Sequence, residues 1–214
     1  LWREKEMPSL KKVTRNLERI YGVRPNVASV EAELHKRKGD PKEQALQFVK
    51  DTRTVAQKVF EKNIVKITPK YETRVIETPP YLVSMIPTAA MTAFDGLTDK
   101  PFSVFFVTTD PRFSPSSTVP DLIGSLLHEE YGHAVNYSNS APRIAAKPTF
   151  IATLSSVFST LISDGLSFYR EFEFVELLKK LVKKKALSKE ETTLLKVLGG
   201  EGDNKTMLLE NEFH

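Results

Sequence analysis

The sequence contains no cysteine and little histidine, and both facts limit its possible chemistry. With no cysteine among 214 residues, disulfide bonds and thiolate metal ligands are excluded, so any metal ion would have to be held by histidines and carboxylates. Only four histidines occur, so any clustering of them is informative. The absence of cysteine also fits a protein of a reducing compartment, and we expect a cytoplasmic location.

Long apolar runs and a strong charge excess are missing too. No run approaches the ~18 apolar residues of a transmembrane helix, and we expect neither a signal peptide nor a membrane partner. The net charge is only +4. The basic runs His35–Lys38 and Lys180–Lys185 are typical of solvated helix faces, and no nucleic-acid motif accompanies them. Nucleic-acid binding through the basic helix at 175–185 is therefore only a weak alternative.

The ends of the sequence suggest a piece of a larger protein. The chain opens at Leu1 rather than at methionine, and it stops at His214 without an obvious closing element. We therefore expect the remainder of a longer parent chain as a partner. The sequence does not indicate the oligomeric state.

Hydrophobic periodicity predicts a predominantly α-helical chain of the α+β class. Apolar residues recur at helical spacing in three early segments, at about 4–20, 26–36 and 41–65. Asp40 and Pro41 look like the start of the third of these helices. We predict that residues 1–68 form a helical support region.

Strand signals begin beyond Pro69. Alternating β-branched and apolar residues predict strands at 73–78 and 101–109 and allow one at 87–93, so we expect a small antiparallel sheet within 70–110. Two long helices are predicted to follow, at 119–138 and 148–183. The segment Phe150–Phe168 is mostly apolar and is expected to be deeply buried.

The segment Leu126–Asn136 reads L-L-H-E-E-Y-G-H-A-V-N and contains His128, Glu129 and His133. Neutral imidazoles can hold a zinc ion, and an adjacent glutamate can take a proton from a metal-activated water. Five residues of an ideal α-helix turn about 500°, which would leave the two imidazoles roughly 140° apart. A π-type widening would bring them together, and Gly132 has the backbone freedom to permit it. The alternative is a histidine–glutamate pair on a helix surface.

Asp164 and Glu171 lie in the second long helix, seven residues apart and therefore on the same side. In zinc peptidases with a two-histidine helix, the third ligand is typically a carboxylate on a following helix. Asp164 fits that place, and Glu171 could accept a hydrogen bond from a ligand histidine. The alternative is that Asp164 is an exposed residue at a kink and that Glu171 pairs with Arg170 or a lysine.

Four motifs, in this order, resemble those of the domain-of-unknown-function 885 family. They are E-T-P-P-Y-L (77–82), F-F-V-T-T-D-P (105–111), H-E-E-Y-G-H (128–133) and D-G-L-S-F-Y-R-E (164–171). The third also resembles the H-E-x-x-G-H of dipeptidyl peptidase III. The family looks like a branch of the zinc metallopeptidases, and the resemblance covers about residues 40–180. The family's histidine segment is one residue longer, and Asp164 and Leu166 stand where it has Glu and Trp.

The resemblance implies a zincin core of the thermolysin type, with residues 69–214 as the catalytic region. It implies that His128, His133 and Asp164 are metal ligands, that Glu129 is the general base and that Glu171 supports a ligand. One Zn²⁺ suits two histidines and a carboxylate best, although manganese, cobalt and iron are also compatible.

The function expected from these residues is zinc-dependent hydrolysis of peptides. Glu129 would remove a proton from the attacking water and return it to the leaving amine. Tyr131 or Tyr169 could donate a hydrogen bond to the reacting carbonyl. Strand 102–108 could pair with an extended peptide substrate or could be an internal strand of the sheet. The alternative function is a catalytically inactive binding or structural module that keeps the peptidase fold.

Overall fold

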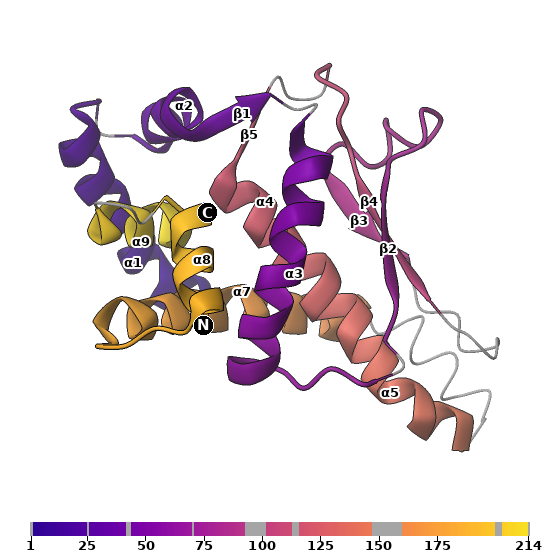
Figure 1. Cartoon of the computed structure of the whole chain (residues 1–214). Helices are drawn as coiled ribbons and strands as arrows, with labels where there is room; N and C mark the ends of the chain where they lie inside the picture. Colours follow the sequence, from indigo (N-terminus) through magenta and orange to yellow (C-terminus); the bar gives the residue numbers. More distant parts are fainter. Residues whose placement is uncertain are drawn as a thin grey trace.

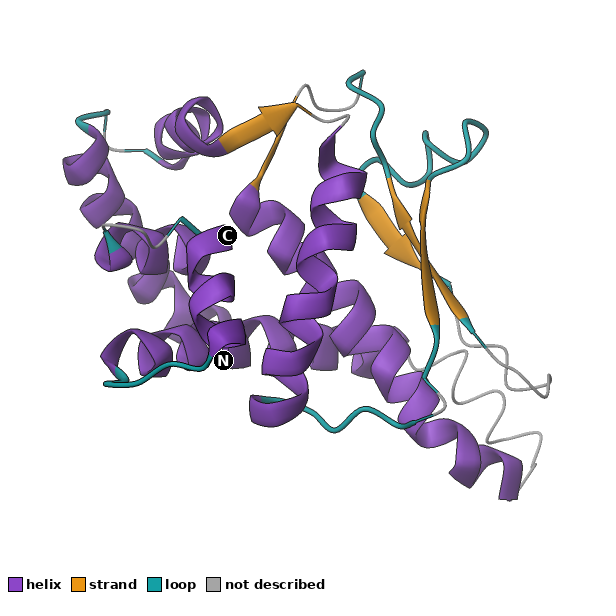
Figure 2. Cartoon of the chain, viewed as in Figure 1, coloured by secondary structure: helices purple, strands orange, loops and turns teal. Residues whose placement is uncertain are grey.

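The computed structural model describes residues 2–24, 26–41, 44–69, 71–92, 102–112, 116–146, 160–199 and 203–213. In these ranges the chain is mostly helical with a small amount of sheet, so the α+β class is confirmed (Figures 1 and 2). The helices are α1 (Trp2–Tyr21), α2 (Val27–Lys38), α3 (Ala45–Asn63), α4 (Val119–Leu126), η2 (Leu127–Ala134), α5 (Val135–Ala146), α7 (Thr160–Lys183), α8 (Lys189–Val197) and α9 (Asn204–Phe213). The strands are β1 (Gly39–Pro41), β2 (Thr73–Glu77), β3 (Ala89–Met91), β4 (Ser103–Val107) and β5 (Ser116–Thr118).

The predicted start of the third helix at Asp40 and Pro41 is wrong. Residues Gly39–Pro41 form β1, which pairs antiparallel with β5, and α3 begins only at Ala45. A proline is tolerated in such a two-stranded ribbon because its missing N–H can face away from the partner strand. The local signal was therefore overridden by pairing with a segment far along the chain.

The three-stranded sheet is mixed, whereas an antiparallel sheet was predicted. The strand order is β2-β4-β3, with β4 parallel to β2 and antiparallel to β3. Parallel neighbours need a long connection, and the segment 78–102, which includes β3, supplies it. Because β4 has a partner on both sides, the internal reading of strand 102–108 is correct. Among the described residues, β2 and β3 are the two edge strands of this sheet, each paired only with β4.

Two buried clusters form the core. The larger joins α3, β4, α4, η2, α7 and α8, with Phe60, Phe105 and Leu178 among its fully buried side chains. The smaller lies between α1 and α2, and residues of α9 pack against it. In Figure 1, α3 lies between the sheet and the group of α1, α8 and α9. α3 lies before the predicted domain boundary at 68/69, yet it packs into the same core as elements that follow the boundary. The boundary itself stays a prediction.

The C-terminal helix α9 was missed in the sequence. Asp203 accepts hydrogen bonds from the backbone N–H groups of Lys205 and Thr206, so it caps the first turn of α9. Buried Met207 joins the main core, and Glu210 accepts a hydrogen bond from Tyr21 of α1 at 2.6 Å. The contact between Tyr21 and Glu210 spans almost the whole chain and has no local signal, whereas the Asp203 cap is a local signal that was overlooked.

The helix that carries the histidines begins with strong local signals. Thr118 and Asp121 form a capping box, and Pro120 lies in the first turn. The helix then continues through η2 into α5 and ends at Ala146, beyond the predicted residue 138. Of the predicted helix 148–183, the structure describes the part from Thr160. The expected deep burial of Phe150–Phe168 is wrong at Phe168, which is half-exposed; the side chains of 150–162 lie outside the described residues.

Candidate metal centre

The histidine segment forms a π-helix, η2, inserted between α4 and α5. At its end the N–H of Val135 bonds to the carbonyl of Glu130, five residues back. This widening brings His128 and His133 to the same side, with ring centroids 5.1 Å apart. The distortion that the five-residue spacing called for is therefore present.

Gly132 has a different role from the one predicted. Its φ is not positive, so the backbone does not need a glycine there. A Cβ at this position would instead overlap the side chain and the Cα of Ser167, which is fully buried on α7. The missing side chain therefore allows η2 and α7 to approach closely, and this approach brings the histidines to the carboxylates of α7.

We expect Gly132→Ala to reduce the free energy of unfolding by about 1–3 kcal/mol, because the added methyl overpacks the contact between η2 and α7. The matched control is Gly165→Ala. Gly165 also lies in a helix, but a Cβ there meets nothing within 4 Å. That change should stabilise the protein by about 0.5–1 kcal/mol. Urea unfolding of both variants checks the prediction, and equal effects at the two glycines would contradict it.

Residues His128, His133 and Asp164 form a group that could hold a metal ion, with one ligand atom from each lying within 4.8 Å of the others. Nε2 of His133 and Oδ1 of Asp164 are 3.4 Å apart. Ligands at about 2.0–2.1 Å from a tetrahedral zinc ion are roughly 3.4 Å from one another. The donor types and this spacing therefore fit such an ion. Asp164 contacts His133, but its side chain is 42% exposed, so the alternative of an exposed aspartate also stays open as a prediction.

Hydrogen bonds from outside the cluster fix both imidazole rings. Nδ1 of His128 lies 2.7 Å from Oε1 of Glu171, and Nδ1 of His133 lies 2.7 Å from Oγ of Ser163. If both Nδ1 atoms carry the proton, each Nε2 is left with a lone pair for a metal. The predicted contact of Glu171 with a histidine is present, and Arg170 pairs with Glu173 instead.

Ser163 was missed in the sequence, because a single serine before Asp164 gives no signal by itself. Its hydroxyl also lies 3.2 Å from the hydroxyl of Tyr137, whose ring stacks on His133 at 6.4 Å between centroids. Tyr131, one of the tyrosines considered earlier, is fully buried with its ring edge-on to Phe60 in the core. The tyrosine beside the cluster is therefore Tyr137.

We expect Glu171→Ala to weaken metal binding about 10–100-fold, because His128 would lose the acceptor that orients its ring. Glu176→Ala is the matched control, since Glu176 lies on the same helix and pairs with Lys179 instead. Competition with a chromophoric chelator measures both affinities. Equal affinities in the two variants would mean that Glu171 does not support the cluster.

Glu129 lies where the π-helix meets the edge of the sheet. Backbone bonds from Thr92 to Val104 and from Thr108 to Thr88 join alternate residues of the β3 segment to β4. The N–H of Met91 therefore points the other way, toward the Glu129 carboxylate, and it acts to lower the pKa of that group. The Glu129 carboxylate is therefore close enough to both the outer side of β3 and His128 for each to act on its pKa.

The pKa values of Glu129, His128 and His133 are shifted by different causes. Loss of solvent raises the pKa of Glu129 above its usual value, against the opposing effects of His128 and the Met91 N–H. The hydrogen bond to Glu171 raises the pKa of His128, whereas burial lowers the pKa of His133. A carboxylate with a raised pKa is better able to take up a proton and pass it on near neutral pH.

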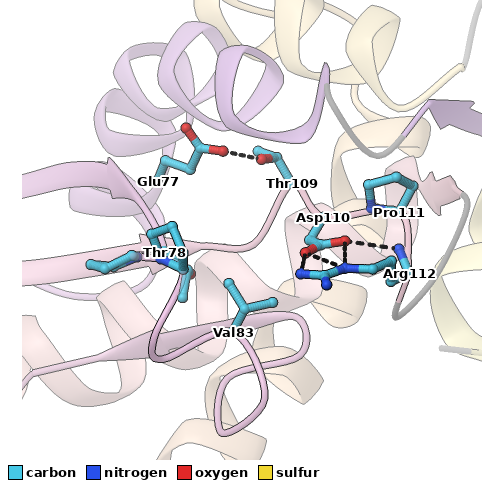
Figure 3. Close-up of a pocket in the computed structure, with 9 residues that line it drawn as sticks. Glu77, Thr78, Val83, Thr109, Asp110, Pro111 and Arg112 are labelled. Atoms are coloured by element: carbon cyan, nitrogen blue, oxygen red, sulfur yellow. Dashed lines mark hydrogen bonds and ion pairs between the residues drawn. The ribbon is translucent and has the colours of Figure 1, made fainter.

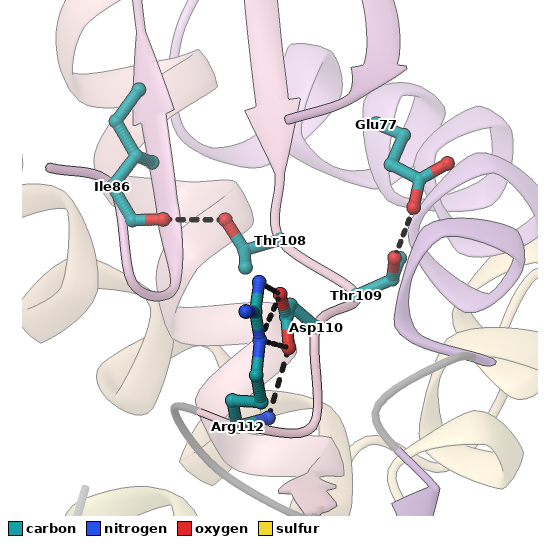
Figure 4. Close-up of polar contacts among 6 residues, drawn as sticks. All are labelled: Glu77, Ile86, Thr108, Thr109, Asp110 and Arg112. Carbon is teal, nitrogen blue, oxygen red and sulfur yellow. Dashed lines mark hydrogen bonds and ion pairs between the residues drawn. The ribbon is translucent and has the colours of Figure 1, made fainter. Parts of the chain in front are cut away.

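A separate pocket of about 490 Å³ lies where the parallel strands β2 and β4 end (Figure 3). It is lined by Glu77, Thr78, Pro79, Pro80, Val83, Thr109, Asp110, Pro111 and Arg112. Arg112 pairs with Asp110 and lowers the pKa of that carboxyl to about 2, while Thr109 bonds to Glu77 (Figure 4). The pocket includes none of the candidate metal ligands, and these charged groups already have partners within it.

In the described part of the chain, no helix is both long and apolar enough to cross a membrane. Comparison with known proteins gives no match, whether to a family model, to a curated sequence or to a solved structure.

Proposed function

We propose that the chain is a metal-dependent peptide hydrolase, with zinc as the metal and a zincin-type centre like that of the family it resembles. The observation that carries this proposal is the π-helix, which aligns His128 and His133 beside Asp164. A solvated surface pair would need neither the π-helix nor hydrogen bonds that orient both rings.

The donor set favours zinc on chemical grounds. Two imidazole nitrogens and one carboxylate oxygen are typical of catalytic zinc sites, which keep further positions open for water or substrate. The three ligand side chains are all partly accessible to solvent, so such a position could be reached. His128, His133 and Asp164 would hold the ion, which when bound would polarise the peptide carbonyl and acidify the attacking water.

Glu129 carries the proton transfers in this proposal. Its carboxylate takes a proton from the attacking water and gives it to the amine that leaves. The Met91 N–H faces this carboxylate, and an ionised carboxylate has further lone pairs that can accept the proton of the water. Glu171 and Ser163 keep the imidazole rings in place during these transfers.

The free side of β3 is the place that we propose for the substrate backbone. The earlier candidate, strand 102–108, has partners on both sides, whereas β3 pairs only with β4 among the described strands. An extended peptide could add to this edge through the outward main-chain groups other than the Met91 N–H, which faces Glu129. Because Met91 contacts Glu129, such a peptide would run directly past the proposed base.

Metal content of the purified chain tests the proposal. We expect about one zinc ion per chain by elemental analysis, lost in His128→Ala because one of the three ligands is removed. His35→Ala is the matched control, since His35 lies on α2 and faces Asp121 at 3.9 Å. No metal in the unaltered chain after zinc is supplied would contradict the proposal and would favour the inactive binding module.

A further inference from the structure

Three large aromatic residues of α7 are exposed, and one of them, Phe168, lies beside the candidate metal centre. Phe168 is 54% exposed, Tyr169 is 51% exposed and Phe172 is 50% exposed. The rings of Tyr169 and Phe172 lie 6.4 Å apart. We refer to these three residues as the aromatic face of α7. Exposed apolar groups that are concentrated in this way often mark a binding surface.

Phe168 joins this face to the metal centre. On α7 it follows Asp164 by four residues and precedes Glu171 by three, so the three side chains project from the same side of the helix. Its ring lies edge-on to His128, with 5.0 Å between centroids. Asp164 and Glu171 in turn contact His133 and His128. The exposed ring therefore lies directly against the ligand group.

We propose that the aromatic face of α7 binds an aromatic or large aliphatic side chain of the peptide substrate, next to the bond that is cleaved. This inference rests on the proposed function and specifies its substrate class. A peptide held at the centre must place a side chain near His128, where Phe168 offers an apolar ring surface. An acidic side chain would lose hydration on the ring without gaining a partner and is disfavoured.

The test uses quenched fluorogenic peptides that differ at one central residue, which is Phe, Leu, Ala or Asp, in a Gly/Ser background. The zinc-loaded chain should cleave the Phe and Leu peptides at least about tenfold more efficiently than the others, as expected for burial of a large apolar side chain. Phe168→Ala should lower kcat/KM for the Phe peptide about tenfold more than it lowers kcat/KM for the Ala peptide. Phe168→Leu should keep most of the preference.

A second readout does not depend on turnover. Fluorescence anisotropy measures binding of the same labelled peptides to a Glu129→Gln chain without added metal. The Phe peptide should bind more tightly than the Asp peptide, and Phe168→Ala should weaken its binding about tenfold. Tyr81→Ala is the control, since Tyr81 is 79% exposed in the turn after β2 and is not part of the aromatic face.

The outcomes separate this inference from the proposed function. Cleavage without preference among the four peptides would contradict the proposed role of the aromatic face but would support the proposed hydrolase activity. Tighter binding of the Phe peptide that depends on Phe168, without cleavage of any peptide, would support the proposed role of the aromatic face. It would contradict the proposed hydrolase activity. Equal binding of all four peptides would overturn the inference whatever the activity.

Discussion

Replacing Glu129 with glutamine should abolish peptide hydrolysis while the metal stays bound. The amide has nearly the same shape, and its oxygen can still face the Met91 N–H, but it cannot take up a proton from water. Glu129 is also outside the group formed by His128, His133 and Asp164. We expect a loss of about 10²–10⁴-fold in kcat, the usual contribution of a general base.

Peptide turnover and metal content should be measured on the same preparation of Glu129→Gln. Glu176→Gln serves as the matched control, because it makes the same chemical change on α7 at a residue that pairs with Lys179. Full activity in Glu129→Gln would remove Glu129 from the mechanism. Loss of both metal and activity would mean that Glu129 supports the ligand group rather than the proton transfer.

The second large effect is expected at Arg53, the partner of a fully buried carboxylate. Glu130 is 0% exposed and follows Glu129 directly in η2. Nε of Arg53 lies 2.7 and 2.8 Å from its two oxygens, and the Tyr71 hydroxyl donates to it at 2.5 Å. This cluster ties the π-helix to α3 and to the segment that leads into β2.

Arg53→Ala should reduce the free energy of unfolding by about 3–5 kcal/mol, because it leaves the Glu130 charge buried without its main partner. Lys58→Ala is the matched control on the same helix. Lys58 pairs with Glu190 at 3.9 Å near the surface, and its loss should cost less than about 1 kcal/mol. Urea unfolding measures the free energy of unfolding of the two variants and checks this difference.

The double variant Arg53→Met with Glu130→Leu should recover much of the stability that Arg53→Ala loses, because no buried charge is left without a partner. Equal stability of Arg53→Ala and Lys58→Ala would show that the Glu130 cluster does not anchor the π-helix. A double variant no more stable than Arg53→Ala would instead assign the loss to packing around Arg53.

The residues brought together at the site could be predicted because they lie in two helices, where the spacing along the sequence tells which side chains share one side. The five-residue interval between His128 and His133 required a widened helix, and the structure has one. Asp164 and Glu171, two turns apart, reach different histidines from the same side of α7. Gly132 was singled out for backbone freedom, but it matters for its missing side chain.

The remaining features depend on contacts between distant segments. The direction of β2 relative to β4 is set by how the chain returns to the sheet, and the pairing of Gly39–Pro41 with β5 joins residues far apart in sequence. Ser163 acts only through its position beside His133, and Arg53 only through Glu130. None of these partners is recognisable from the residues that flank it.

The π-helix also bears on how metal sites of this kind can diversify. A residue added within one widened turn is absorbed there, because the helix is regular on both sides, in α4 and α5. The core residues before and after the added residue can then stay on the buried side of the helix. The spacing between the two histidines meanwhile grows by one residue. Two side chains that share one side of a helix can therefore be five residues apart as well as four, provided that a widened turn lies between them.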